Sequence, residues 1–316
     1  MSTVVNSVIG PISGDQLGVT LTHEHLWCDI AVHSRNPDNT IKNVPLVVEE
    51  LRYYTRLAGR SIVEVTAEGL SRNPAALRAI SEASGVQIIS GIGFYQPEVY
   101  PNWVRKASVT EIADYFVRQV NDGTDGVRAG IIGELASHNE SLPNPAGYRL
   151  REDEARVFRA AAIAQRATGV PISTHASLGR GGHAQLDVLA DAGADLLKVA
   201  IGHCDAHWHH EAERDMSYYV PILERGAYCA FDLIGWEELA PDEIRAKRIA
   251  ALVALGYERR IVLSTDTCRL SQLHHHGGRG FDHMFSSFLP RLRRIGITEQ
   301  QITAMLVEAP RSLLAG

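Results

Sequence analysis

Histidine is the residue whose placement stands out in this sequence. The chain has 14 histidines among 316 residues, although its formal net charge is −6. Two of them, His23 and His25, are separated by one residue at the end of an apolar run. Side chains alternate along a strand, so these two imidazoles point the same way and Glu24 points away. Two imidazoles on one face can hold one cation, and imidazole with carboxylate suits zinc and similar divalent ions.

Further side chains that can bind metal also end apolar runs, namely Glu134, His175, His203 and Asp266. We expect Asp266 to complete the first site and His175 and His203 to hold a second ion. Glu134 can bridge both ions with its two oxygens. Two metals about 3.5–4 Å apart would trap a hydroxide at neutral pH. Asp266 can accept the proton as that hydroxide attacks, so the set predicts a binuclear metal-dependent hydrolase.

The elements that would position these residues alternate along the chain. Continuous apolar runs are typical of strands covered on both faces, and they predict strands at residues 19–25, 62–66, 87–93, 129–135, 171–176, 196–203, 227–233 and 261–267. Apolar residues at helical spacing predict helices at residues 110–119, 152–168, 184–192, 216–225 and 242–255. This alternation favours an α/β fold, a (β/α)₈ TIM barrel, over a doubly wound open sheet. The carboxyl ends of barrel strands meet on one face and would bring the six side chains together.

The two ends of the chain complete this picture. Residues 3–18 contain Gly10-Pro11 and Gly14-Asp15 and predict a short N-terminal β-hairpin extension. Residues 298–314 predict the last helix. We expect a single barrel domain over residues 1–316, because this length fits one large domain.

Other residues near the strand ends are candidates for supporting roles. Phe94 and Tyr95 follow the third predicted strand and are expected to wall the substrate pocket, where a phenol can hydrogen-bond the attacked group. Asp205 and Asp232 follow the sixth and seventh strands, and either can orient a metal-binding histidine through its other ring nitrogen. The segment 268–281 follows the last strand and is expected to overhang the site. Its three adjacent histidines, and His207, His209 and His210, are expected in solvated loops.

Composition excludes several partners. A pI near 6.2 and an aromatic content of 7% speak against nucleic-acid binding. No apolar stretch approaches the roughly 18 residues that span a bilayer. The N-terminal residues lack the pattern of a signal peptide. The four cysteines form no Cys-x-x-Cys pair and are expected to be reduced thiols of a cytoplasmic protein acting on a small molecule.

Several short motifs carry a family resemblance. They are Thr22-His23-Glu24-His25, Ile131-Ile132-Gly133-Glu134, Thr174-His175, Ile201-Gly202-His203-Cys204-Asp205, Phe231-Asp232-Leu233-Ile234-Gly235, Ser264-Thr265-Asp266 and Gly277-Gly278-Arg279-Gly280-Phe281-Asp282. In this order they resemble the phosphotriesterase family of the amidohydrolase superfamily, from about residue 8 to residue 312. The resemblance implies a (β/α)₈ barrel, two divalent ions (usually zinc, with manganese or cobalt as alternatives) and a homodimer. It implies hydrolysis of lactones, organophosphate triesters, other esters or, in some branches, amides.

The resemblance also assigns ligands. It implies that His23, His25 and Asp266 hold the buried metal, and that His175 and His203 hold the more exposed one. The best-known members bridge their metals with a carboxylated lysine, whereas Glu134 stands here, as in the phosphotriesterase homology and phosphotriesterase-related branch. A glutamate offers the same single negative charge and two oxygens, so the bridge is retained.

Four hypotheses remain open on the sequence. The favoured one is hydrolysis of an ester-like bond, a lactone or carboxylic ester before a phosphotriester. An N-acyl amide hydrolase is the close alternative, because the same hydroxide attacks either carbonyl. A catalytically silent, ligand-binding barrel is disfavoured by the complete ligand set. A zinc deaminase or nuclease shares the His-x-His motif, but the deaminase needs one metal and the acidic charge disfavours the nuclease.

Overall fold

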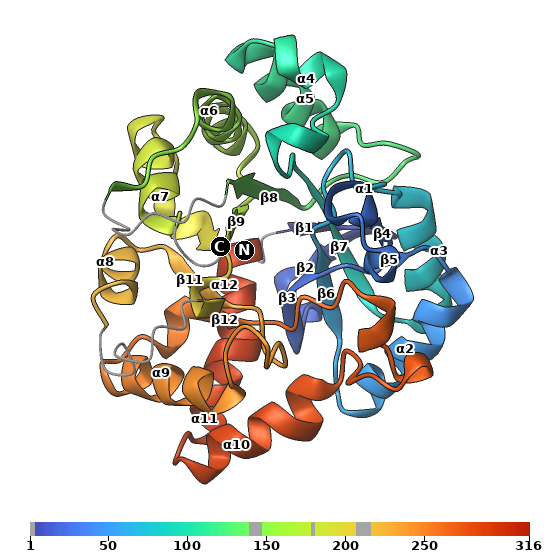
Figure 1. Ribbon diagram of the computed structural model, residues 1–316, viewed down its shortest axis with the longest axis vertical. Helices are drawn as coiled ribbons and strands as arrows, with labels where there is room; N and C mark the ends of the chain where they lie inside the picture. The colour runs from blue at the N-terminus through green and yellow to red at the C-terminus, as the bar shows by residue number, and fades with distance from the viewer. Residues whose placement is uncertain (1–3, 139–146, 178–180, 207–215) are drawn as a thin grey trace.

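Eight parallel strands form the wall of a barrel, with helices around its outside (Figure 1). The computed structural model describes residues 4–138, 147–177, 181–206 and 216–316. Neighbouring strands follow the order β3-β6-β7-β8-β9-β10-β11-β12. All ladders within this sheet are parallel. The predicted TIM barrel is therefore confirmed.

The barrel strands are short and almost entirely buried. They are β3 (Thr20–Glu24), β6 (Ser61–Glu64), β7 (Gln87–Ile92), β8 (Ile131–Ser137), β9 (Ile172–Ala176), β10 (Val199–Ile201), β11 (Tyr228–Phe231) and β12 (Ile261–Leu263). Two small antiparallel pairs lie outside the barrel sheet, namely β1 (Val4–Ser7) with β2 (Gly10–Ser13) and β4 (Cys28–Asp29) with β5 (Thr40–Ile41). Each predicted strand corresponds to one barrel strand.

Helices connect the strands and cover the barrel. Those of the first half are α1 (Ala31–Ser34), α2 (Val44–Arg56), α3 (Pro74–Ser84), α4 (Asn102–Lys106), α5 (Val109–Asn121) and α6 (Glu152–Thr168). Those of the second half are α7 (Gly182–Asp191), α8 (Tyr219–Glu224), α9 (Asp242–Ala254), α10 (Leu289–Arg294), α11 (Glu299–Thr303) and α12 (Ala309–Ala315). The five predicted helices are present as α5 to α9, and the predicted last helix forms α11 and α12 with one π-helical turn between them. Within the described residues, none of these helices has the length and apolarity to cross a membrane.

Local sequence signals explain several helix ends. Ser108 begins α5 with a capping box, in which its hydroxyl accepts from the Glu111 backbone and the Glu111 side chain accepts from the Ser108 backbone. Asn43 and Asn73 cap α2 and α3, each followed by proline in the first turn. Gly169 ends α6 with φ of 76°, a conformation that favours glycine.

The N-terminal hairpin closes one end of the barrel. Strand β1 pairs with β2, and Asn6 Nδ2 donates to the Ala129 carbonyl at 3.0 Å. Apolar side chains of the hairpin form one buried cluster with strand residues inside the barrel, namely Val5, Ile12, Leu17, Val63, Val65, Ile89, Ile131, Leu314 and Ala315. The larger core lies between the strands and the surrounding helices. The predicted hairpin extension is thus present, and it fills the barrel end remote from the strand C-termini.

Most of the barrel strands are shorter than predicted, and β10 and β12 differ most from the prediction. The expected strand at 196–203 begins with a 3₁₀ turn over Leu196–Lys198, so β10 spans only three residues. The expected strand at 261–267 ends at Leu263, because residues 264–267 leave the regular ladder. All four cysteines are buried and free of disulfides, as expected for packed thiols.

A buried carboxylate joins the first and last strands of the barrel. Glu24, at the end of β3, accepts hydrogen bonds from Ser264 Oγ (2.8 Å), Thr265 N (2.7 Å), Thr265 Oγ1 (2.7 Å) and Thr267 N (2.8 Å). The backbone adds the bond from Asp266 N to His23 O at 3.2 Å. Glu24 therefore accepts four of the hydrogen bonds that close the barrel at this seam, and it holds the backbone on both sides of Asp266.

We predict that Glu24→Gln destabilises the fold. The amide nitrogen of glutamine cannot accept a hydrogen bond, so the buried Thr267 N–H would lose its partner. The free energy of unfolding should fall by about 1–3 kcal/mol, measured by urea denaturation. The matched control is Glu49→Gln, an exposed residue of α2, which should change stability by less than about 0.5 kcal/mol. Equal stability of the two variants would show that the seam does not depend on this carboxylate.

Candidate metal centre

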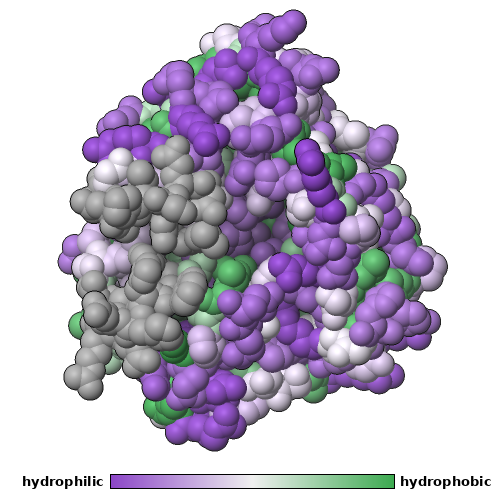
Figure 2. Space-filling view, in the orientation of Figure 1, coloured by the Kyte–Doolittle hydropathy of each residue, from purple (hydrophilic) through white to green (hydrophobic). Residues whose placement is uncertain are grey.

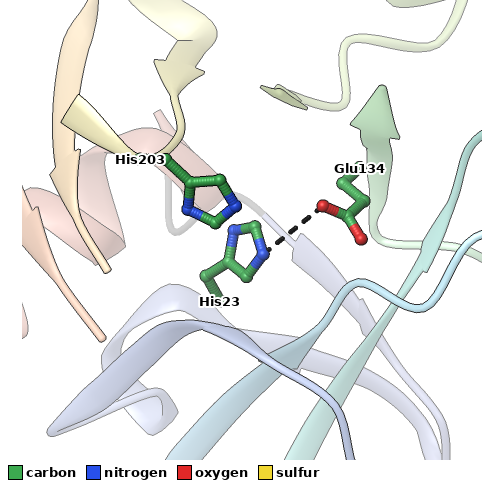
Figure 3. Close-up of side chains that lie close together, drawn as sticks. All are labelled: His23, Glu134 and His203. Atoms are coloured by element: carbon green, nitrogen blue, oxygen red, sulfur yellow. Dashed lines mark ion pairs between the residues drawn. The ribbon is translucent and has the colours of Figure 1, made fainter. Parts of the chain in front are cut away.

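The six predicted ligand residues meet at the carboxyl ends of the barrel strands. His23 and Glu134 lie on β3 and β8, His175 lies on β9, and His25, His203 and Asp266 lie in the turns after β3, β10 and β12. Figure 3 shows His23, Glu134 and His203 pointing toward one another from β3, from β8 and from the turn after β10. All six are buried except His175, which is partly exposed. Strands far apart in sequence thus place imidazoles and carboxylates around one point.

The first group of donor atoms comprises His23, His25 and Asp266. One ligand atom of each lies within 4.8 Å of the other two. Asp266 Oδ1 is 3.2 Å from His25 Nε2 and 3.8 Å from His23 Nε2. This is the group predicted to hold one metal ion.

The second group surrounds Glu134. Its Oε2 lies 3.0 Å from His175 Nδ1 and 3.5 Å from His23 Nε2, the ion pair drawn in Figure 3. His203 Nε2 lies 2.8 Å from His175 Nδ1. The other carboxylate oxygen, Oε1, is 3.7 Å from His25 Nε2. Glu134 therefore faces both groups, in the position that a bridging carboxylate requires.

The donor atoms fit a cation better than they fit one another. Both ring nitrogens of His23 and Oδ1 of Asp266 are buried without an aligned hydrogen-bond partner among the described residues. Buried polar atoms without partners are costly, so Nε2 of His23 and Oδ1 of Asp266, which face each other at 3.8 Å, are suited to a bound cation. Imidazole nitrogens with carboxylate oxygens are a donor set suited to zinc and related divalent ions.

The pKa shifts of the histidines and of Glu134 are also consistent with a metal site. Burial lowers the pKa of His203, but the Asp232 carboxylate outweighs it and raises that pKa to about 10. Burial and the neighbouring His203 lower the pKa of His175. Burial favours the neutral form of Glu134, yet the bond to His175 and the adjacent imidazoles lower its pKa to about 2. The carboxylate is held ionised, and a divalent ion would take the place of the histidine proton.

Asp232, at the residue after β11, supports one histidine from each group. Its Oδ1 accepts from His203 Nδ1 at 2.7 Å and from His203 N at 2.9 Å. Its Oδ2 lies 3.2 Å from His23 Nδ1. A carboxylate on the outer nitrogen of a histidine fixes the ring orientation and leaves the inner nitrogen free for metal. The structure thus places Asp232 where an orienting residue would stand.

Among the described residues, Asp205 has no hydrogen bond to a histidine side chain, contrary to the prediction. It accepts from Arg245 Nε at 2.8 Å and from Leu233 N at 3.0 Å. It therefore fixes the backbone after β11, next to Asp232, and is itself paired with a buried arginine. The sequence could not show this pairing, because Arg245 lies 40 residues away on α9.

A cavity of about 340 Å³ opens onto both groups. Figure 2 shows a hollow near the centre of the mostly hydrophilic face that Figure 1 presents. The segment after β11 contributes an apolar wall of Leu233, Trp236 and Leu239. Tyr95, Gln96 and Ser177 add polar groups at the ends of β7 and β9. Neither lysine nor arginine lines the cavity in the part of the chain that the structure describes.

The two aromatic residues after β7 have different surroundings. Tyr95 lines the cavity, and its hydroxyl is 3.3 Å from His175 Nε2. Phe94 does not line it, so the prediction that Phe94 walls the pocket is wrong. Its ring packs away from the site against Tyr100, Trp103, Tyr115 and Phe116. Adjacent side chains on an extended backbone point in opposite directions, and only Tyr95 faces inward.

The segment 268–281 contributes little to the cavity. Cys268 is its one member among the described lining residues. His274 and His275 donate their backbone N–H groups to Glu50, and the His274 ring bonds Asp282. This segment is thus held against α2, so the expected overhang is limited to its first residues. His207, His209 and His210 lie outside the described residues.

Two supporting residues were missed by the sequence analysis. Thr66 Oγ1 lies 2.8 Å from His25 Nδ1, and the same hydroxyl donates to Glu64 Oε1 at 2.5 Å. Glu64 ends β6 and is fully buried. An acidic residue inside an otherwise apolar strand run was a signal that could have found it.

Comparison with known proteins agrees with the site. The model of the phosphotriesterase family matches residues 3–314. The chain belongs to the phosphotriesterase family. A phosphotriesterase homology protein from Escherichia coli (strain K12) is 33% identical over 301 residues, which cover 95% of this chain and 98% of the relative. N-acetyltaurine hydrolase from Xenopus tropicalis is 31% identical over an alignment of 359 positions, which covers 99% of this chain and 98% of the relative.

Solved structures of the phosphotriesterase family share the fold. The E. coli phosphotriesterase homology protein, crystallised with phosphate in its active site, has a TM-score of 0.88 at 32% identity and covers 95% of this chain and 99% of its own. A mutant of a PTE-like lactonase from Deinococcus radiodurans has a TM-score of 0.84 at 30% identity and covers 98% of this chain and 99% of its own. This family member is accordingly a hydrolase.

We predict that Asp232→Asn weakens metal binding at both groups of this phosphotriesterase-family protein. Asparagine removes the charge that both His23 and His203 face, and loss of such an outer partner typically costs about 10–100-fold in metal affinity. Metal content after dialysis against a buffered zinc solution measures the effect. The control is Asp191→Asn, an exposed residue at the end of α7. Metal content equal to that of the control would remove Asp232 from the site.

Proposed function

We propose that this protein is a binuclear metal-dependent hydrolase. It cleaves the bond between an acyl carbon and its leaving group, foremost in a lactone or carboxylic ester. The observation that supports it most is the convergence of four imidazoles and two carboxylates on one cavity, with unpartnered donor atoms turned toward a common centre. In this proposal His23, His25 and Asp266 hold one ion. His175 and His203 hold the second, and Glu134 bridges them. Zinc is the expected metal, with manganese or cobalt as alternatives.

The protein groups around the reacting bond have separate tasks. Divalent ions bound here would supply Lewis acidity, which polarises a carbonyl group and acidifies water at neutral pH. Asp266 lines the cavity, so the oxygen of its carboxylate that does not hold metal can accept a proton and later return it to a leaving group. The Tyr95 hydroxyl faces the cavity and can donate to a substrate oxygen. Leu233, Trp236 and Leu239 offer apolar surface to an acyl group.

The lining favours an uncharged substrate. A sulfonate, phosphate or carboxylate on a ligand is usually met by arginine or lysine, which make charge-assisted hydrogen bonds. The described lining offers neither. A lactone or a simple carboxylic ester needs no such partner, and PTE-like lactonases are among the related structures. Both observations support the ester-like substrate over an anionic one.

An N-acyl amide is the second candidate. It is favoured by the similarity to N-acetyltaurine hydrolases over nearly the whole chain. An amide presents the same carbonyl carbon, but its nitrogen must be protonated before it leaves. Asp266 can serve both reactions, because the proton that it accepts can be returned to either oxygen or nitrogen.

Proton release by the zinc-loaded protein tests the reaction class. The panel holds γ- and δ-lactones, simple carboxylic esters, N-acyl amino acids, N-acetyltaurine and an aryl dialkyl phosphate. We expect turnover of a lactone or ester first. Turnover of the N-acyl compounds alone would move the assignment to an amidase. Silence across the panel from a protein that binds no metal would contradict the proposal and favour a ligand-binding barrel.

We predict that Asp266→Asn abolishes turnover without unfolding the protein. The amide cannot accept the proton, and general-base catalysis is worth roughly 10²–10⁴-fold, so kcat should fall by at least that range. Steady-state rates on the best panel substrate measure it, and circular dichroism checks the fold. Asp191→Asn again serves as the control. A rate within a factor of two of wild type would remove the role assigned to Asp266.

We also predict that activity does not depend on carbon dioxide. Glu134 is a carboxylate by itself, so the bridge needs no carboxylated lysine. Chelation should inactivate the protein, and zinc added in bicarbonate-free, degassed buffer should restore the full rate. A requirement for bicarbonate would show that Glu134 is not the bridge.

A further inference from the structure

The two nitrogens of the His25 ring face different surroundings. Nε2 points into the candidate metal centre, 3.2 Å from Asp266 Oδ1. Nδ1 points out of it, 2.8 Å from Thr66 Oγ1. A neutral imidazole carries one proton, so Nε2 can bind a metal only when Nδ1 holds that proton. The partner of Nδ1 therefore decides whether His25 can act as a ligand.

Thr66 alone cannot make that decision, because a hydroxyl can donate or accept. Its direction is set by Glu64, whose Oε1 accepts the Thr66 proton at 2.5 Å. With its single proton directed at Glu64, Thr66 Oγ1 presents only lone pairs to His25. His25 Nδ1 must then be the donor, and its Nε2 lone pair faces the metal centre.

The Glu64 carboxyl group lies behind the strand ends, where its neighbours hold it in position. Burial raises the pKa of Glu64, while the His25 ring, the Thr66 hydrogen bond and the Arg72 guanidinium act against that rise. Arg72 is itself fixed by the bond from its Nε to the Gly91 carbonyl at 2.7 Å. The Glu64 carboxylate thus accepts a hydrogen bond from Thr66, and the buried Arg72 guanidinium lies near it.

We propose that Glu64 and Thr66 form a hydrogen-bond relay that positions His25 and fixes its metal-binding tautomer. Both act through His25 and neither is expected to touch substrate, so they are positioning residues. The inference rests on the proposed function, because it presumes a metal at the group of His23, His25 and Asp266.

The relay should act on one metal position only. His203 and His23 receive their outer partner from Asp232, and His175 has the Tyr95 hydroxyl beside its outer nitrogen. His25 is the one candidate ligand among the described residues that contacts Thr66. Loss of the Thr66 hydroxyl is therefore expected to weaken one metal site and spare the other, in contrast to the loss of Asp232.

Titration of the metal-free protein with Co²⁺ tests the relay without reference to activity. Co²⁺ bound to histidine and carboxylate is followed by its visible absorption, and competition with a chelator gives the affinities. The variants are Thr66→Val, which keeps the shape and loses the hydroxyl, Thr66→Ser, which keeps the hydroxyl, and Glu64→Gln. The matched control is Thr20→Val. Thr20 is as buried as Thr66, but it lies at the start of β3, remote from the candidate metal centre, and its hydroxyl donates to the Gly18 carbonyl.

Thr66→Val should weaken the binding of one Co²⁺ equivalent by about 10–100-fold and leave the other unchanged. Thr66→Ser should restore wild-type affinity, and Glu64→Gln should weaken the same equivalent by a smaller factor. Glu64→Gln carries the test by itself if Thr66→Val does not fold. Affinities of Thr66→Val and Glu64→Gln equal to that of Thr20→Val would overturn the relay while the proposed function stands. A wild-type protein that binds no Co²⁺ would overturn both.

Discussion

The Glu24 carboxylate is the constraint on which the rest of the site depends. It accepts four hydrogen bonds from the segment 264–267 and is fully buried at the seam between β3 and β12. Asp266, within that segment, has φ of 44°, a left-handed conformation that is unfavourable for a residue with a side chain. The bonds to Thr265 and Thr267 hold the backbone on either side of it. The same hydrogen bonds thus help to close the barrel and place Asp266 beside His23 and His25.

Charge explains why the site needs so many outer contacts. Glu134, Asp232 and Asp266 bring three carboxylates into one buried region, together with four imidazoles. Carboxylates that are out of water must be paired or must bind metal. Each imidazole can meet a metal through only one nitrogen, so a defined partner on the other nitrogen decides its orientation. The carboxylate of Asp232, the hydroxyl of Thr66 and the phenol of Tyr95 are such partners, and each comes from a different strand end.

The sequence was sufficient to predict the fold and to predict that the six candidate ligand residues lie together. Parallel strands read as continuous apolar runs, and their C-terminal ends share one barrel face, so residues such as Glu134 and Asp266 could be brought together without coordinates. It was not sufficient for contacts between side chains of distant segments. The pairing of Asp205 with Arg245 and the relay from Glu64 depend on how helices and strands pack. Whether Phe94 or Tyr95 faces the cavity depends on which side of the backbone points inward. That side depends on the residue at which β7 ends.

In the proposed function, substrate choice depends on lining residues other than the candidate metal ligands. The apolar wall of Leu233, Trp236 and Leu239 follows β11, whereas Gln96 and Ser177 follow β7 and β9. Gln96 and Ser177 bond each other, whereas Trp236 Nε1 donates to the carbonyls of Thr265 and Asp266 at the seam held by Glu24. Exchange of Leu233, Leu239, Gln96 or Ser177 can therefore change which acyl group and which leaving group fit without removing a candidate metal ligand. Because Asp266 can return its proton to oxygen or to nitrogen, the division between ester and amide hydrolysis would lie in this lining and not in the metal centre.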